Sequence, residues 1–207
     1  MTKRNKLGKA FIILGAVSLF AALFLVLWNK YESDRAKESA DKALSQLMEK
    51  MPETTISSEE AQQLKDNGSL PSDDSYIPTI EVDGNLYIGV IYIPAIDTEL
   101  PVMKDWSYAN LDISPCRYYG QIKNSNLIIA AHNYATFFDR LDELNAGDEI
   151  FYVTVDGVCY EYEVTQTELI DGGNSYIMRD NSDKWDLTLF TCTWSGYSRV
   201  TVRAVLK

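Results

Sequence analysis

An unbroken apolar run near the N-terminus restricts the structures that this chain can adopt. The run Phe11 to Trp28 includes no ionisable side chain, and Lys3, Arg4, Lys6 and Lys9 come just before it. Eighteen such residues are enough to cross a bilayer as a helix, which satisfies its own backbone hydrogen bonds. A secretory signal peptide is the alternative, but the run is long for one and no small-x-small cleavage site follows it. We therefore predict an uncleaved membrane anchor.

The basic residues ahead of the anchor predict its orientation, because loops rich in Lys and Arg stay on the cytoplasmic side of a membrane. We expect residues 1–9 to form a cytoplasmic tail, residues 10–28 to be the anchor, and everything from Asn29 onward to lie outside the cell. That outer part holds 15 Lys and Arg against 30 Asp and Glu, a formal charge of about −15. Such a negative charge argues against nucleic acid as a partner.

Residues 29–75 have the pattern of a helical stalk and linker. Ala, Leu and Met recur at helical spacing from Ala36 to Met51, and Pro52 ends the pattern. This narrow apolar stripe either packs against the rest of the outer domain, which we favour, or mediates self-association. A second short helix is predicted from Ser57 to residues 67–68, because Ser57 and Glu60 have the spacing of a capping box.

Residues 76–207 consist of short runs rich in Ile, Val, Tyr and Thr, separated by Gly, Pro, Asn and Asp. Asp156-Gly157 is a hairpin signal, and helical signal is limited to residues 108–113 and 136–144. The runs that we interpret as strands are 86–93, 99–103, 126–131, 149–155, 158–170, 187–192 and 199–206. Seven or eight strands without regular helical crossovers predict a mainly β domain that forms a closed or nearly closed β-barrel.

The last two predicted strands bring a cysteine and an arginine together. If they pair as antiparallel neighbours around the loop 193–198, Cys192 and Arg199 face each other with Cβ atoms about 5 Å apart. A guanidinium in that position can stabilise the oxyanion that forms when a thiolate attacks a carbonyl. Arg203 has the same strand parity, but it lies opposite Thr188, roughly 13 Å deeper along the strand. We favour Arg199 and keep Arg203 as the alternative.

The chain contains a single histidine, so any acid–base chemistry by an imidazole must use His132. His132 follows the apolar run 127–131 at the end of a predicted strand, where a side chain can project into a surface groove. The three cysteines cannot all pair with one another. Either Cys116 and Cys159 form a disulfide that leaves Cys192 free, or all are unpaired thiols.

Several of these segments resemble one known family. The run TLFTC, which ends at Cys192, resembles the TLxTC signature of sortases, the cysteine transpeptidases of the Gram-positive cell surface. Arg199 begins the next predicted strand, as the arginine of that family does. The resemblance spans most of 86–206, including IGVIYIPAIDTELPV, NLIIAAHN and FDRLDELNAGDEIFYVTVDGVCYEYEV. The N-terminal anchor also fits this family.

Carried over residue by residue, the resemblance implies an eight-stranded sortase-type barrel in residues 76–207. It implies that Cys192 is the nucleophile, that His132 is the general acid and base, and that Arg199 positions the substrate and stabilises the oxyanion. The implied reaction cleaves a C-terminal sorting signal at a threonine carbonyl and joins that carbonyl to an amine. This chemistry requires no cofactor.

The resemblance also implies partners and a substrate groove. The partners are surface proteins that carry a sorting signal, and an amine acceptor that is either a peptidoglycan precursor or a pilin-type protein. The groove is expected between the loops 171–186 and 193–198, with Thr191, Trp194 and Tyr197 in contact with the substrate.

Some members of the family bind calcium, and Glu143, Asp148 and Asp171 are carboxylates that could serve as ligands. Their spacing does not match an EF-hand loop, and acidic residues are frequent throughout this chain. We predict no obligatory metal.

One alternative belongs to a different functional class: a membrane-tethered β-barrel that only binds a partner, with Cys192 a structural thiol. A papain-like hydrolase fits less well, because its cysteine precedes its histidine and begins a helix.

Overall fold

The structure is a computed structural model that describes residues 3–53, 55–57, 59–60, 63, 77–174, 176–180 and 184–207. It divides into two compact units, Met1–Arg35 and Ala36–Lys207. The helix α1 (Lys3–Lys50) contributes residues to both units, and every described strand lies in the second.

The first unit is the N-terminal part of α1, which carries the apolar run with its side chains exposed. Of the helices that the structure describes, α1 is the one long and apolar enough to cross a membrane. Beyond the apolar run the helix continues through charged residues. An ion pair between Lys30 and Asp34, one helical turn apart at 3.3 Å, supports the helix there.

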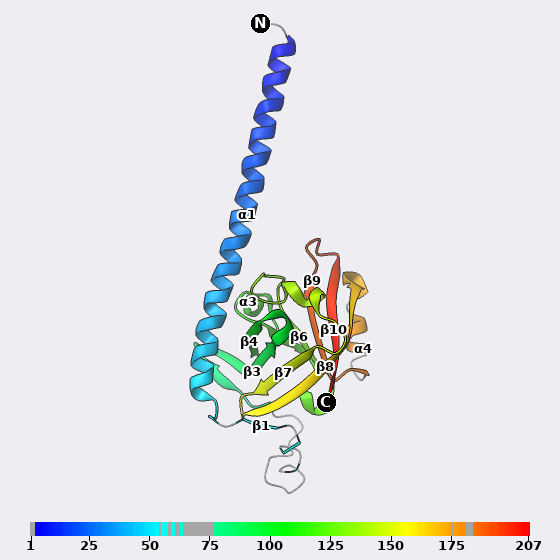
Figure 1. Ribbon diagram of the computed structural model, residues 1–207. Helices are drawn as coiled ribbons and strands as arrows, with labels where there is room; N and C mark the ends of the chain where they lie inside the picture. Colours follow the sequence, from blue (N-terminus) through cyan, green and yellow to red (C-terminus); the bar gives the residue numbers. More distant parts are fainter. Residues whose placement is uncertain are drawn as a thin grey trace. The chain divides into compact units, whose positions relative to one another are not determined.

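Eight strands of the second unit close into a barrel (Figure 1). They are β3 (Asn85–Ile93), β4 (Thr98–Met103), β5 (Cys116–Tyr119), β6 (Leu127–Ala130), β7 (Glu149–Thr154), β8 (Val158–Asp171), β9 (Leu187–Cys192) and β10 (Ser198–Leu206). Their order around the barrel is β3-β4-β5-β6-β9-β10-β8-β7, and β7 pairs back onto β3. The short strands β1 (Ile56–Ser57) and β2 (Ile80–Val82) extend β8 and β3. The predicted eight-stranded barrel is confirmed for the described part of the chain.

Short helical segments connect the strands. They are α3 (Tyr108–Leu111), α4 (Tyr176–Asp180), η1 (Pro94–Ile96), η2 (Ile122–Asn124), η3 (Asp139–Glu143) and η4 (Gly172–Asn174). The segments expected at 108–113 and 136–144 correspond to α3 and to η3, a 3-10 helix. Of the helix expected from Ser57, only the start lies within the described residues, where the Glu60 N–H donates to Ser57 Oγ at 3.2 Å.

Alternate residues of the barrel strands pack into two apolar layers. In β9, Leu187 and Leu189 belong to one layer and Phe190 belongs to the other. In β10, Val200 and Val202 join the same layer as Leu187 and Leu189. Successive side chains of a strand point to opposite faces, so both faces of this part of the sheet are covered. A strand buried on both faces explains the nearly continuous apolar sequence of β9.

The C-terminal part of α1 covers the barrel with the stripe of small and apolar residues. Ala36, Ala40, Ala43 and Leu47, spaced by three or four residues, are buried in the same two layers as the strands. Of the two alternatives for this stripe, packing against the domain is the one that the structure shows. An ion pair at 2.7 Å from Lys42 Nζ to a carboxylate oxygen in the β2–β3 turn reinforces the contact.

Three described strands were absent from the sequence prediction, the short β1 and β2 and the barrel strand β5. The strand β5 has only four residues, CRYY, and lies between Pro115 and Gly120, which the sequence analysis took as loop signals. It is stabilised by parallel pairing with β4 and antiparallel pairing with β6. The expected turn at Asp156-Gly157 joins β7 to β8, with Gly157 at a φ of +85° that suits a glycine.

We predict that Leu47→Ala destabilises the domain by about 2–5 kcal/mol, because Leu47 is 0% exposed and its truncation leaves a cavity between α1 and the barrel. The measurement is urea unfolding of the 207-residue chain in detergent, followed by near-ultraviolet circular dichroism. The control is Met48→Ala on the same turn, which is 54% exposed and should change stability by about 0.5 kcal/mol or less. Equal effects of the two substitutions would show that α1 does not pack on the barrel in solution.

Candidate active site

The predicted histidine and cysteine lie at the same edge of the barrel because β6 and β9 are parallel neighbours. Ala130, the last residue of β6, is paired with Phe190. His132 and Cys192 therefore each lie two residues beyond a paired position on adjacent strands that run in the same direction. Side chains at the carboxyl ends of neighbouring parallel strands share one sheet edge, and such edges commonly form functional sites.

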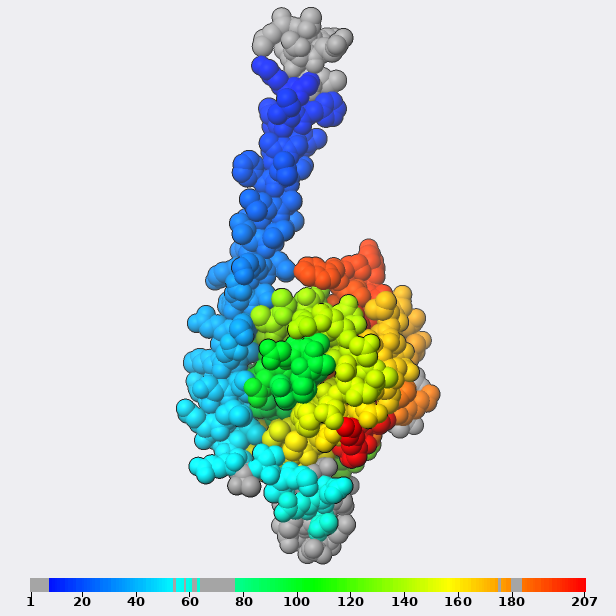
Figure 2. All heavy atoms as spheres, in the orientation of Figure 1, coloured from blue at the N-terminus to red at the C-terminus, as the bar shows by residue number. Residues whose placement is uncertain are grey.

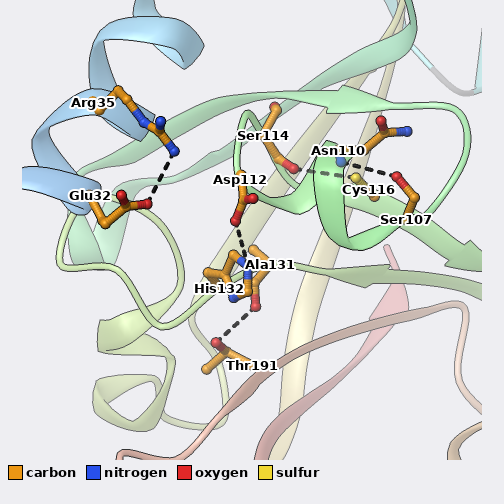
Figure 3. Close-up of polar contacts among 10 residues, drawn as sticks. All are labelled: Glu32, Arg35, Ser107, Asn110, Asp112, Ser114, Cys116, Ala131, His132 and Thr191. Carbon is orange, nitrogen blue, oxygen red and sulfur yellow. Dashed lines mark hydrogen bonds and ion pairs between the residues drawn. The ribbon is translucent and has the colours of Figure 1, made fainter. Parts of the chain in front are cut away.

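Two hydrogen bonds join the strands directly beneath these residues. The Ala131 N–H donates to Phe190 O at 3.2 Å. The Thr191 hydroxyl donates to Ala131 O at 2.9 Å, and Figure 3 shows this bond next to the histidine. Thr191 is only 1% exposed. Its side chain therefore lies in the wall between β6 and β9, rather than on the open surface that its expected contact with a substrate requires.

The register of β9 and β10 is the one predicted from the sequence. Arg199 is paired with Cys192, and Arg203 with Thr188. Directly paired residues point to the same face of an antiparallel sheet, so the Arg199 and Cys192 side chains lie on one side. Arg199 Nη1 donates to Gly196 O at 2.9 Å and to Ser198 O at 3.0 Å, which holds the guanidinium at the base of the 193–198 loop.

Arg203 has a different environment, although it lies on the same face of β10. Its side chain is 2% exposed, and Arg203 Nε donates to a carboxylate oxygen of Glu168 at 2.8 Å. Arg203 Nη1 donates to the Thr188 hydroxyl at 3.0 Å. A buried guanidinium held by a carboxylate and a hydroxyl has a structural role. Of the two arginines, Arg199 is the one that is paired with Cys192 and held beside the 193–198 loop.

His132 has a carboxylate partner that the sequence analysis did not identify. His132 Nε2 lies 3.2 Å from Asp112 Oδ1, and Figure 3 shows the two side chains pointing toward each other. Asp112 is the C-terminal cap of α3, whose N-terminus is capped by the Ser107 hydroxyl. The His132 ring also packs on Tyr134, with 5.0 Å between the ring centroids. Together the carboxylate and the ring fix the orientation of the imidazole.

The loop 193–198 projects from the end of the barrel beside Cys192, where Figure 2 shows it in orange-red. Its ends are joined by a hydrogen bond from the Thr193 N–H to Ser198 O at 2.9 Å. The two aromatic residues predicted to contact the substrate are its most exposed large side chains: Trp194 is 77% and Tyr197 is 81% exposed. Both are free to meet a ligand.

An aromatic cluster extends from the site along the face of Cys192. Phe190, two residues before Cys192 on the same face, contacts Tyr118 edge-on with 5.1 Å between ring centroids. Trp106 contacts Tyr118 in the same manner at 5.7 Å, and Arg179 Cζ of α4 lies 4.5 Å from the Tyr118 ring centroid. This cluster was not predictable from the sequence, because Tyr118 belongs to the unpredicted strand β5 and the other residues come from distant segments.

The other two cysteines are poorly suited to be nucleophiles. Neither forms a disulfide. Cys116 is buried, and desolvation together with the Asp105 charge raises its pKa to about 12 despite a hydrogen bond with the backbone of Ser107. Burial, followed by the charge of Glu161, also raises the pKa of Cys159. Both thiols therefore stay protonated near neutral pH, and a thiol is a weak nucleophile.

The carboxylates considered as calcium ligands each have another partner. Glu143 pairs with Arg140 at 2.7 Å, Asp148 accepts the Asn145 N–H at 2.8 Å, and Asp171 accepts the Gly173 N–H at 2.8 Å. Among the described residues, no group of three His, Cys, Asp or Glu side chains is arranged to hold a metal ion.

Comparisons with known proteins agree with this arrangement. A family model of the sortase domain matches residues 91–207. The chain is 28% identical over 107 residues to sortase D of Bacillus subtilis, covering 50% of this chain and 53% of that protein. It is 30% identical over 129 residues to sortase A of Listeria monocytogenes, covering 59% of this chain and 57% of that protein. The chain thus spans just over half the length of these relatives.

Solved structures support the fold. A Clostridium perfringens sortase D5 transpeptidase superimposes with a TM-score of 0.56 at 20% identity, covering 84% of this chain and 99% of that one. Sortase E of Streptomyces avermitilis gives 0.50 at 23% identity, covering 58% of this chain and 88% of that one. Because the family model covers more than half of the chain, including His132, Cys192 and Arg199, the chain belongs to the sortase family.

Proposed function

We propose that this protein is a sortase-type cysteine transpeptidase. It cleaves a C-terminal sorting signal and joins the threonine carbonyl to an amine of a cell-wall peptide or of another protein. The observation that carries the proposal is the convergence of His132, Cys192 and Arg199 at one barrel edge, from the ends of β6, β9 and β10. A nucleophile, a base and an anion-stabilising group in this arrangement suit acyl transfer.

In the first step, Cys192 attacks the carbonyl carbon of the threonine as a thiolate whose proton is held by His132, and the C–S bond forms. The carbonyl oxygen becomes negatively charged in the tetrahedral intermediate, and the guanidinium of Arg199 stabilises it. The C–N bond of the peptide then breaks, and His132 gives a proton to the departing amine. A thioacyl enzyme remains.

In the second step, an incoming amine attacks the thioester carbon. His132 takes a proton from the amine nitrogen, the new C–N bond forms, and the electrons of the broken C–S bond return to sulfur. The product is an amide, and the enzyme returns to its starting state without any cofactor. Asp112 orients the imidazole through both steps and so has the place of the third member of a catalytic triad.

The side chains around Cys192 offer a surface for the sorting signal. The aromatic cluster of Phe190, Tyr118 and Trp106 lies on the same face as the reactive sulfur and the Arg199 side chain. We propose that the acyl donor lies along this cluster and that Trp194 and Tyr197 contact it from the loop. Thr191 contributes indirectly, because its hydroxyl bond to Ala131 O keeps the strands of the histidine and the cysteine in register.

The N-terminal helix suits the same function. We propose that α1 anchors the enzyme in the cell membrane with its N-terminus in the cytoplasm, because its apolar run is preceded by basic residues. The barrel then lies outside the cell, where surface proteins bearing sorting signals and an amine acceptor, a peptidoglycan precursor or a pilin-type protein, are its partners. The charge of about −15 on this part disfavours nucleic acid.

The first test compares the parent protein with Cys192→Ala on a library of peptides that carry threonine at the scissile bond, with hydroxylamine as the amine. We expect the substitution to lower peptide cleavage by about 10³-fold or more, because no thioacyl enzyme can form. Mass spectrometry should find the acyl fragment on Cys192 of the parent. Cys159→Ala is the matched control and should cleave at the parental rate. Equal cleavage by the Cys192→Ala protein would refute a thioacyl mechanism.

The second test separates the two arginines of β10. Arg199→Ala should reduce the rate of peptide cleavage by about 10²-fold or more with little change in melting temperature, because the oxyanion loses its cation. Arg203→Ala should instead destabilise the fold by about 1–3 kcal/mol, because Thr188 and Glu168 lose their buried partner, while the folded fraction stays active. Cleavage kinetics and thermal unfolding of both variants provide the comparison. If Arg203→Ala, and not Arg199→Ala, lowered the rate of peptide cleavage by the folded protein, Arg203 would be the residue that stabilises the oxyanion.

A further inference from the structure

The turn that follows β8 is joined to the loop beside the cysteine. The pairing of β8 with β10 ends at Asp171 and Ser198. One residue further, the Gly172 N–H donates to Tyr197 O at 2.7 Å. This hydrogen bond continues the ladder into the loop 193–198. Gly172, the first residue of η4, is therefore fixed against the loop.

Strand alternation decides which way a side chain at position 172 would point. Arg199 is paired with Ile170 of β8 and with Cys192 of β9, so these three side chains share one face of the sheet. Gly172 lies two residues beyond Ile170, so a side chain there would return to the same face. It would enter the space beside the guanidinium of Arg199.

This space leaves no room for a side chain at position 172. A Cβ atom there would lie 2.8 Å from Tyr197 O, 3.1 Å from Arg199 Nη1 and 3.4 Å from Arg199 Cζ. The first distance is too short for two atoms that are not bonded, and the second is tighter than an ordinary contact. The φ angle of Gly172 lies outside the left-handed region, so the backbone itself does not require a glycine. The glycine is needed for close approach.

Carbonyl groups hold the guanidinium of Arg199 in this space. Arg199 Nη1 donates to Gly196 O at 2.9 Å and to Ser198 O at 3.0 Å. The acid of the adjoining turn is directed elsewhere, because Asp171 Oδ1 accepts the Gly173 N–H at 2.8 Å. Carbonyl acceptors fix the guanidinium without removing its net charge.

A methyl group at position 172 would displace the guanidinium. Tyr197 O cannot retreat without lengthening the hydrogen bond from the Gly172 N–H. If Tyr197 O does move, the adjacent acceptor Ser198 O moves with it, and otherwise the guanidinium of Arg199 has to yield. Both adjustments shift the cation. A displacement of about 1 Å in a group that acts on reacting atoms can lower a rate by about 10²-fold.

We propose that Gly172 is a positioning residue for Arg199. The proposal rests on the transpeptidase function above and adds a residue to its first step. Gly172 acts through the guanidinium and not on the reacting atoms. By leaving the space beside η4 open, it holds the cation on the face of Cys192, where the oxyanion forms.

The first test compares Gly172→Ala with Gly173→Ala, which add the same methyl group to adjacent residues of one turn. At position 173 the new Cβ would meet only Asp171 Oδ1, at 3.0 Å, and this carboxylate can rotate away. The substrate is the best peptide of the threonine library. We expect Gly172→Ala to lower kcat for cleavage about tenfold or more with little change in KM, because the lost interaction belongs to the transition state. Gly173→Ala should lose less than about threefold.

A double-mutant cycle separates positioning from support of the fold. If Gly172 acts through the guanidinium, Gly172→Ala should slow the Arg199→Ala protein by less than about twofold further. An effect on donor binding, on the loop or on folding would persist without the guanidinium and add to the loss. Melting temperatures of the four proteins show whether each variant is folded at the temperature of the assay.

A second measurement does not depend on peptide cleavage. Iodoacetate is an anion and iodoacetamide is neutral, so the ratio of their rates of alkylation at Cys192 reports a cation near the sulfur. Mass spectrometry of the peptide that contains Cys192 gives both rates. The ratio of iodoacetate to iodoacetamide should fall about threefold or more in Gly172→Ala, toward the value of Arg199→Ala. It should stay near the parental value in Gly173→Ala.

The outcomes distinguish the two proposals. A folded Gly172→Ala protein with parental kcat, with a parental alkylation ratio, or with an equal loss in the Arg199→Ala background would overturn the positioning role alone. A parent that cleaves no library peptide, but whose alkylation ratio falls in Gly172→Ala, would overturn the transpeptidase function and leave the positioning role. A loss of kcat that vanishes without Arg199, together with a lowered ratio, supports the proposal.

The double variant Gly172→Ala/Arg199→Ala decides the case in which Gly172→Ala alone does not fold, as judged by near-ultraviolet circular dichroism. A folded double variant would support the steric link between position 172 and the guanidinium. An unfolded one would show that Gly172 serves the fold and would refute the positioning role.

Discussion

The parallel pairing of β6 with β9 is the constraint on which the candidate site depends. The side chains of a strand alternate between faces, so a slip of one residue between β6 and β9 would turn Cys192 and His132 toward opposite faces. Three local features hold this register. Ala130 is paired with Phe190, the Ala131 N–H donates to Phe190 O, and the buried Thr191 hydroxyl donates to Ala131 O. Thr191, the residue before the cysteine, therefore stabilises the register from a buried position. Its hydroxyl pairs with the Ala131 carbonyl, which an apolar residue at position 191 would leave without this hydrogen bond.

The two arginines of β10 show how position along a strand decides the use of one residue type. Both point to the same face, but Arg203 lies deeper along β10, between β8 and β9. Its side chain is buried there and is neutralised by Glu168. Arg199 lies at the rim, where its partners are carbonyl oxygens. Carbonyl groups hold a guanidinium without removing its net charge, so Arg199 keeps the positive charge that an oxyanion needs.

The sequence predicted the relations that are local and missed those that depend on barrel closure. The register of Cys192 with Arg199 follows from a six-residue loop between two adjacent strands, so strand alternation was enough to predict it. Asp112 was missed as the partner of His132, because the strands β5 and β6 separate them along the chain and only the folded barrel brings them together.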